Sequence, residues 1–101
     1  MTITAHLPVS DERIAAFCRR WHITELALFG SVLRDDFGPE SDVDVLVEFE
    51  PGHVPGFAFV ALEDELSSLF DGRRVDVVQR QYLNRWLRKR ILTDAQVVYA
   101  A

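Results

Sequence analysis

The stretch SDVDVLVEF, residues 41–49, constrains the fold of this chain more than any other. Apolar residues occupy every second position in it: Val43, Val45, Val47 and Phe49. Because the side chains of a β-strand point alternately to opposite faces, this spacing predicts a strand with its valine face on a core. Asp42 and Asp44 then share the other face, where neighbouring like charges repel each other. Either a cation neutralises them or they lie on a wet surface.

The length of 101 residues suffices for one hydrophobic core, so we expect a single domain over residues 1–101. No apolar run approaches the roughly 20 residues that cross a bilayer, and the N-terminal sequence has no signal-peptide pattern. Cys18 is the one cysteine and cannot form an internal disulfide. We therefore expect a soluble, cytoplasmic protein that does not act at a membrane.

The charge is distributed unevenly along the chain. A net charge of −5 argues against direct DNA binding. Residues 34–50 are acidic, whereas residues 73–90 hold seven basic residues and one acid, Asp76. An acidic site beside a basic surface would suit a metal ion and a polyphosphate. The alternative for most of these basic residues is a solvated helix face.

Apolar spacing and breaker residues predict the remaining elements. Helices are expected from the N-cap Ser10 to near His22, over residues 31–37 in a short turn of helix, over 59–70 and over 83–91. Strands are expected over residues 23–29 and 74–78, with residues 96–99 as a fourth strand or a packed tail. Turns or loops are expected over residues 38–41 and 50–56. Helices that alternate with strands indicate an α/β or α+β domain.

Several residues with distinctive chemistry are expected to be structural. Cys18 lies in an apolar helical pattern and is predicted to be a small core residue. Trp21 and Trp86 also lie on apolar helical faces and are predicted to anchor the core. The three histidines, at positions 6, 22 and 53, are too scattered for their spacing to indicate a metal site.

The paired aspartates have the character of a metal site. Asp42 and Asp44, two apart on a strand, have Cα atoms about 6 to 7 Å apart and carboxylates on one face. Mg²⁺ prefers carboxylate, water and phosphate oxygens, so an ion with a bound phosphate would relieve the repulsion. Asp76, on a later strand, could complete a triad that holds two ions about 3.5 to 4 Å apart.

Gly30-Ser31 lies between a predicted strand and a predicted short helix. Glycine there would let the backbone approach a phosphate, and free amides at a helix start point toward anions. Taken alone, the pair is better explained by a plain turn with a helix cap. The ordered combination of Gly-Ser, Ser-Asp-x-Asp and a third strand aspartate is more specific than any of its parts.

This combination resembles the signature of the DNA polymerase β-like nucleotidyltransferase superfamily, and the chain length matches its minimal nucleotidyltransferases. The matching residues are Leu28-Phe29-Gly30-Ser31, Arg34, Ser41-Asp42-Val43-Asp44-Val45-Leu46-Val47 and Val75-Asp76-Val77-Val78. The resemblance implies a small mixed β-sheet with helices packed on it. It also implies that the nucleotide is ATP and the metal Mg²⁺.

The resemblance also assigns roles to individual residues. Gly30 and Ser31 would contact the nucleotide phosphates, with Ser41 beside them. Asp42, Asp44 and Asp76 would be the catalytic and metal-binding residues, and Asp76 would help to activate the acceptor. Arg34 would contact phosphate or pair with one of its acidic neighbours, Asp35, Asp36 or Glu40. The family often has a small residue and a glycine around this arginine, whereas Leu33 and Asp35 flank it here, which bears on substrate fit.

Two functions remain open at this point. Family members are often antitoxins encoded beside a HEPN-domain ribonuclease, which some inactivate by transferring AMP to a tyrosine. The first hypothesis is therefore a Mg²⁺-dependent enzyme that transfers AMP from ATP to a hydroxyl of a partner protein, a HEPN-domain toxin encoded nearby. The second is a non-catalytic or weakly catalytic antitoxin that neutralises a toxin by direct contact. Asp76 favours the enzyme, because a pure binding module needs no third aligned acid.

Overall fold

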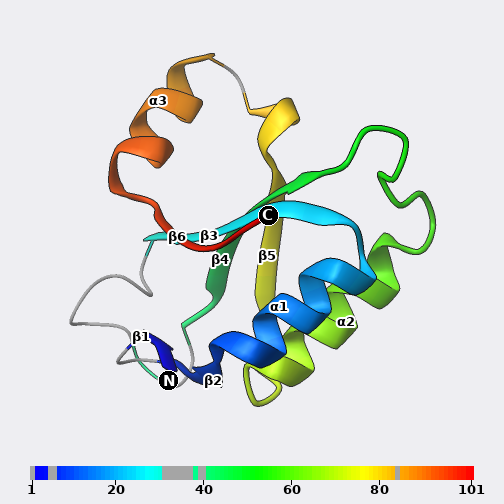
Figure 1. Cartoon of the computed structure of the whole chain (residues 1–101). Coiled ribbons are helices and arrows are strands. Elements are labelled where there is room, and N and C mark those ends of the chain that lie inside the picture. The colour runs from blue at the N-terminus through cyan, green and yellow to red at the C-terminus, as the bar shows by residue number, and fades with distance from the viewer. Residues whose placement is uncertain (1, 5–6, 31–37, 39–40, 84) are drawn as a thin grey trace.

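A four-stranded mixed sheet forms the centre of the computed structural model (Figure 1). The structure describes residues 2–4, 7–30, 38, 41–83 and 85–101. The strands of the sheet, in spatial order, are β5 (Val75–Gln79), β4 (Val43–Phe49), β3 (Ile23–Phe29) and β6 (Gln96–Ala100). β3 pairs antiparallel with β4 and with β6, while β5 runs parallel to β4. The predicted fold class, a small mixed sheet with helices packed on it, is confirmed.

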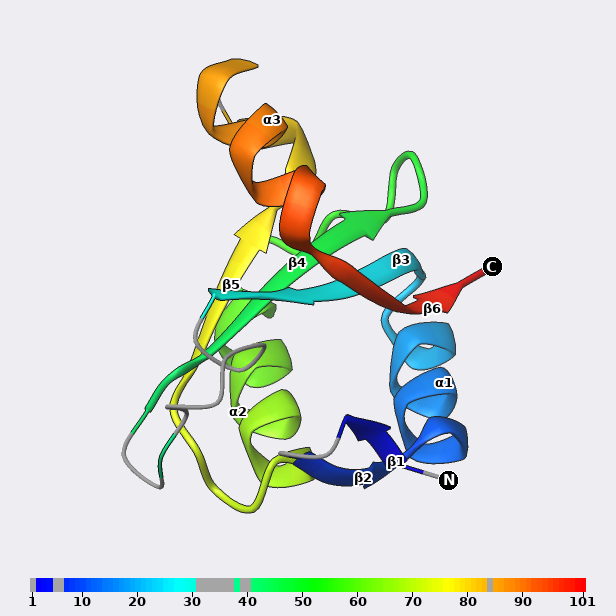
Figure 2. The same cartoon turned by 90° about the vertical axis from the view of Figure 1, so that its left-hand side faces the viewer.

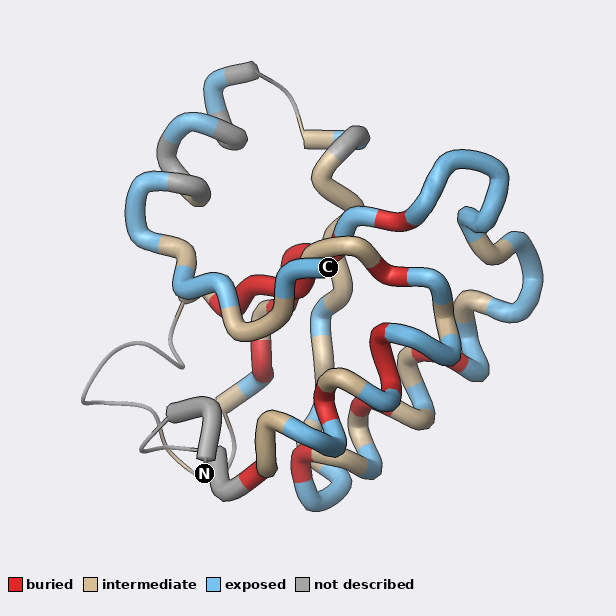
Figure 3. The backbone as a smooth tube through the Cα atoms, viewed as in Figure 1, coloured by how far each residue is buried: buried red, intermediate tan, exposed pale blue. Residues whose placement is uncertain are grey.

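Two helices cover one face of the sheet, α1 (Asp11–Arg20) and α2 (Phe59–Leu69) (Figure 2). The core lies between these helices and the sheet, and Figure 3 shows buried segments on both sides of it. On the valine face of β4, Val43, Val45 and Val47 are at most 1% exposed. Other buried core residues are Ile14, Phe17, Leu26, Leu28, Leu62, Leu66 and Phe70. Each such side chain contributes about 1.5–3 kcal/mol when it leaves water. The alternation of residues 43–49 therefore predicted the core face correctly.

Helix α1 begins as its sequence predicts. The Ser10 side chain accepts a hydrogen bond from the Arg13 N–H at 3.3 Å, which satisfies one of the free amides of the first turn. Asp11 and Glu12 lie in that turn, where their negative charges interact favourably with the positive end of the helix dipole. The helix ends at Arg20, and His22 then adopts a left-handed backbone with φ of 58°.

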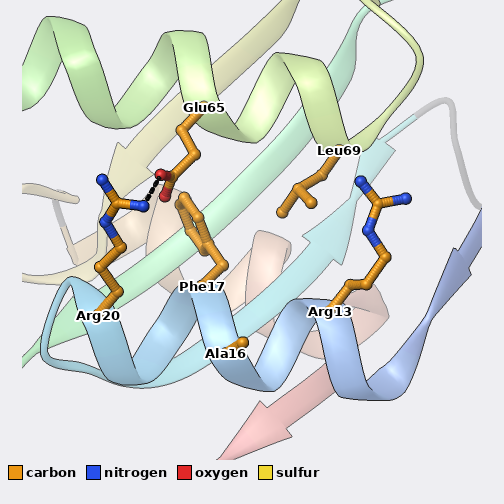
Figure 4. Close-up of a pocket in the computed structure, with 6 residues that line it drawn as sticks. All are labelled: Arg13, Ala16, Phe17, Arg20, Glu65 and Leu69. Atoms are coloured by element: carbon orange, nitrogen blue, oxygen red, sulfur yellow. Dashed lines mark ion pairs between the residues drawn. The ribbon is translucent and has the colours of Figure 1, made fainter.

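Glu65 of α2 links the two helices. Its Oε2 accepts a hydrogen bond of 2.6 Å from Trp21 Nε1. Its Oε1 lies 2.8 Å from Arg20 Nη1, and Figure 4 shows this ion pair as a dashed line. Trp21 also packs against the core, so its prediction as an anchor is confirmed. A pocket of about 280 Å³ opens between the helices beside this link. Its lining residues are Arg13, Ala16, Phe17, Arg20, Glu65 and Leu69.

Helix α3 (Arg85–Asp94) lies on the other side of the sheet from α1 and α2 (Figure 2). The prediction that Trp86 anchors the core is wrong, because 74% of this residue is exposed. Its apolar helical spacing was misleading, since the core face of the sheet is already covered by α1 and α2.

Among the helices of the described segments, none is long and apolar enough to cross a membrane.

Other elements complete or correct the sequence-based predictions. Residues 96–99 belong to a fourth strand, β6, rather than to a packed tail. A two-stranded antiparallel sheet of β1 (Thr2–Thr4) and β2 (Leu7–Ser10) precedes α1 and was not predicted. A turn of 3-10 helix, η2 (Arg80–Tyr82), follows β5. The predicted short helix over residues 31–37 lies outside the described residues.

Candidate active site

Asp44 and Asp76 are direct neighbours across β4 and β5. They are Cα partners in the parallel pairing of the two strands. Neighbouring strands lie about 4.8 Å apart, and partners in register direct their side chains to the same face. Because Val43 and Val45 are buried on the helix side, both aspartates lie on the opposite face. Asp44 is half-buried there, and Asp76 is exposed.

Asp42 lies just before β4, two residues from Asp44. The Val43 N–H donates to the Arg74 carbonyl at 2.9 Å, which extends the pairing with β5 up to this position. The backbone thus brings all three predicted metal-binding aspartates to one region of the sheet. Among the described residues, however, the oxygens of the three side chains do not all lie within 4.8 Å of one another.

Gly30 lies against Asp44 at the end of β3. The preceding residue, Phe29, is the Cα partner of Asp44. Gly30 has a φ of 75°, which L side chains rarely adopt, and a Cβ added to it would overlap Asp44 Oδ2 and lie 3.2 Å from Asp44 Cγ. The sequence predicted this glycine as a place for phosphate to approach. The geometry adds a second requirement, because only glycine leaves room for the Asp44 carboxylate.

A hydrogen-bonded turn leads the chain into β4. The Gly38 N–H donates to Ser41 Oγ at 3.1 Å, and the Ser41 N–H donates to the Gly38 carbonyl at 3.1 Å. Arg73 Nη1 donates to that same carbonyl at 2.9 Å, so the turn is held from the segment before β5. Ser41 therefore has a structural role in placing Asp42. Its contact with a nucleotide stays a prediction.

Two of the basic residues after residue 72 have structural roles. Arg73 holds the turn before β4, and Arg80 Nη1 lies 2.7 Å from Glu25 Oε2 and 3.3 Å from Glu48 Oε2. This favours the structural explanation over a phosphate-binding one for Arg80.

Within the described residues, no ion pair joins Asp76 to Arg73 or to Arg74. Pairing with either arginine therefore does not explain Asp76.

The predicted nucleotide-binding residues are only partly described. Gly30 and Ser41 lie near the aspartates, at the end of β3 and before β4. Ser31 and Arg34 lie outside the described residues, as do the acids with which Arg34 was expected to pair, and their roles stay predictions. The donor set that the backbone assembles consists of carboxylates, which fit a hard divalent cation such as Mg²⁺.

Burial explains why Cys18 takes no part in this site. The residue is fully buried in the core between α1 and the sheet. Burial raises the pKa of its thiol to about 12, although the charge of Arg19 acts in the opposite direction. A thiol with such a pKa stays protonated and unreactive near neutral pH. The prediction that Cys18 is a core residue is confirmed.

The fold agrees with the comparisons to known proteins. The family model described as a nucleotidyltransferase domain matches residues 11–99. The chain belongs to this nucleotidyltransferase family. It is 38% identical over 81 residues to the protein adenylyltransferase MntA of Thermococcus cleftensis. The aligned region covers 79% of this chain and 77% of that relative.

Solved structures support the same membership. A structure assigned to a minimal nucleotidyltransferase is 34% identical, with a TM-score of 0.71 over 84% of this chain and 85% of that one. An antitoxin in complex with a tri-AMPylated HEPN toxin from Shewanella oneidensis shares the fold, with a TM-score of 0.65 at 20% identity over 90% of this chain and 70% of that one. A toxin-antitoxin structure with AMP-PNP has a TM-score of 0.74 at 21% identity, over 92% of this chain and 75% of that one. The last two structures show the shared fold, whereas the family model and the relative of 38% identity show that nucleotidyl transfer is the activity class of this domain.

Proposed function

We propose that this nucleotidyltransferase transfers AMP from ATP to a hydroxyl group of a partner protein, a HEPN-domain toxin encoded nearby. The observation that carries the proposal is the register of Asp44 and Asp76 beside Gly30. This arrangement places two carboxylates on one face of the sheet. Beside them is Gly30, where the backbone has no side chain to keep a phosphate away. The protein adenylyltransferase named among the relatives supports AMP as the transferred group.

Each residue has a distinct part in this proposal. Asp42, Asp44 and Asp76 would hold Mg²⁺, which offsets negative charge on the phosphates when it is bound. Gly30 lets the backbone approach the phosphates, with Ser31, Arg34 and Ser41 as further nucleotide contacts. Asp44 lies so close to Gly30 that a side chain at position 30 would displace its carboxylate.

Asp76 is the best placed of the aspartates to handle a proton of the acceptor. It is exposed and lies on an edge strand of the sheet, where a protein substrate can reach it. The acceptor oxygen forms a bond to the α-phosphorus, and the bond from that phosphorus to pyrophosphate breaks. Asp76 accepts the proton that the hydroxyl loses.

The direct test combines the protein with ATP, Mg²⁺ and the purified product of the adjacent gene. Intact mass spectrometry should show the partner gaining the mass of one or more adenylyl groups, with pyrophosphate released. Chelation of Mg²⁺ and the Asp44→Asn substitution should each prevent the gain. A partner that stays unmodified in the complete mixture would contradict the proposal.

A second function, neutralisation by direct contact, is supported by a different observation. Three large apolar residues near the start of α2 are exposed: Val54, Phe57 and Val60. Phe57 is fully exposed, as expected of an anchor at a protein interface. A transfer-dead variant that still neutralises the toxin would favour this function, and Phe57→Ala should then weaken neutralisation.

A further inference from the structure

A second group of potential metal ligands lies at the other end of the sheet from the aspartates. His22 is in the turn between α1 and β3, Glu50 directly follows β4, and His53 lies three residues farther along. One ligand atom from each of the three lies within 4.8 Å of the others. Glu50 is six residues beyond Asp44 on an extended strand, so about 20 Å separates this group from the aspartates. The group is therefore independent of the active site.

The backbone holds the three residues together. The Glu50 N–H donates to the His22 carbonyl at 2.8 Å, and the His53 N–H donates to the Glu50 carbonyl at 3.0 Å. His22 has a φ of 58°, a conformation in which histidine is found more often than most residues. The turn after α1 and the loop after β4 thus have a fixed relation to each other. Such a framework lets two elements distant in sequence present ligands at one place.

The side chains converge on one carboxylate oxygen. His22 Nδ1 lies 3.0 Å from Glu50 Oε2, and His53 Nε2 lies 4.0 Å from the same oxygen. The two imidazole rings stack with their centroids 4.0 Å apart and an angle of 22° between their planes. Both rings therefore direct a nitrogen toward the same point. Rotation of the two rings out of this stacked arrangement would let all three donors bind one ion.

The chemistry of the donors selects the kind of ion. Two imidazole nitrogens and one carboxylate oxygen are the ligands that Zn²⁺ takes where water completes its coordination. Mg²⁺, in contrast, prefers an all-oxygen set. All three residues are exposed, so both the ion and its water reach them from solvent. We propose that His22, Glu50 and His53 form a Zn²⁺ site that joins the α1–β3 turn to the loop after β4.

The alternative is a metal-free cluster, in which a ring N–H of His22 only donates a hydrogen bond to Glu50. To choose, we would titrate the full chain with Zn²⁺, using Co²⁺ as a spectroscopic probe. Asp42 and Asp44 would both be replaced by asparagine, so that the active-site carboxylates do not contribute. One ion should bind per chain, with the visible absorption of a tetrahedral Co²⁺ site, and Zn²⁺ should raise the melting temperature.

Single substitutions in the same background locate the site. His53→Gln and Glu50→Gln should each weaken Zn²⁺ binding about tenfold or more, because each removes one ligand. His22→Asn should do the same while its backbone is retained, since asparagine tolerates the left-handed conformation. Glu48→Gln is the matched control, because it removes a neighbouring carboxylate that pairs with Arg80, and it should leave binding unchanged.

Imidazole NMR signals provide a readout that a loss of fold would not imitate. The His22 and His53 ring resonances should move when Zn²⁺ is added to the protein with Asp42 and Asp44 replaced. Full Zn²⁺ affinity in the His53→Gln variant would overturn the proposal. The proposal would also be overturned if this protein bound no Zn²⁺ at a millimolar concentration of the ion and the His22 and His53 ring signals did not move.

Discussion

Asp76 lies directly opposite Asp44 in the parallel pairing of β4 and β5, yet the two carboxylates have different environments. Asp44 is half-buried on a central strand and packs on Gly30. Asp76 is exposed on an edge strand. The first residue is suited to a fixed ligand position, and the second is open to an incoming protein substrate. We therefore expect Asp44 to act as a metal ligand and Asp76 to act on the protein substrate, and substitutions can test each role separately.

Asp76→Asn should slow AMP transfer about 10²- to 10⁴-fold, the usual contribution of a general base. ATP affinity should change far less, since Asp42, Asp44 and Gly30 remain. Single-turnover transfer and calorimetric ATP binding, both with Mg²⁺, measure the two effects. Asp64→Asn, an exposed substitution on α2, serves as the control. A wild-type transfer rate in Asp76→Asn would eliminate the catalytic role.

Gly30→Ala should abolish transfer and destabilise the fold, because its Cβ overlaps the Asp44 carboxylate. The left-handed backbone alone costs about 1–2 kcal/mol in a residue with a side chain. Gly52→Ala isolates that cost, since Gly52 has a φ of 81° and nothing within 4 Å of an added Cβ. Urea unfolding should show the backbone cost in both variants and a further loss of stability in Gly30→Ala, and transfer assays should show a loss of activity only in Gly30→Ala. Equal activity in the two would show that contact with Asp44 is unimportant.

Asp42→Asn should abolish Mg²⁺-dependent transfer and leave the fold intact. The substitution removes one carboxylate charge from the predicted metal site and keeps the side-chain shape, so the variant should stay folded while it loses a metal ligand. Circular dichroism and urea unfolding in the absence of Mg²⁺ measure this. Activity retained in a folded variant would move the metal site away from Asp42.

The buried thiol of Cys18 should make stability fall at high pH. Burial raises its pKa from 9.0 to about 12, so between these values the unfolded chain loses a proton that the folded chain keeps. Unfolding then becomes more favourable as pH rises above 9.0, by at most about 1.4 kcal/mol for each pH unit. Urea unfolding at about pH 8 and about pH 10 should show this loss in the wild type. Cys18→Ala should lack that part of the loss, and an identical pH dependence would contradict the assignment.

Glu65→Ala should destabilise the protein by about 1–3 kcal/mol, because Trp21 Nε1 loses its acceptor in a partly buried position. The ion pair with Arg20 adds little, since that arginine is largely exposed. Tryptophan fluorescence and urea unfolding report the change. Glu63→Ala, on the same helix, is the control and should cost less than half as much.

Local sequence patterns predicted the elements that local forces determine. The alternation of Val43, Val45 and Val47 identified β4 and its core face, and the Ser10 cap identified the start of α1. The spacing of Asp42 and Asp44 predicted a shared face. Parallel register between Asp44 and Asp76 could not be predicted, because it depends on how two distant strands pair.

The features that sequence reasoning missed depend on long-range contacts. Trp86 has core-like spacing, but tertiary packing of α1 and α2 decides which helix covers the core. His22 and His53 are 31 positions apart and meet only because the β3–β4 pairing brings their turns together. The close approach of Gly30 to Asp44 is likewise invisible without coordinates.

The pairing of β3 with β6 has a consequence for biosynthesis. Phe29 ends a central strand, and the strand that covers its second edge begins only at Gln96. At about 5–20 residues per second, a ribosome needs several seconds to add the intervening chain. During that interval β3 can pair on one side only, and its open edge is a target for chaperones or for a neighbouring nascent chain. The sheet that carries the aspartates is therefore completed late in translation.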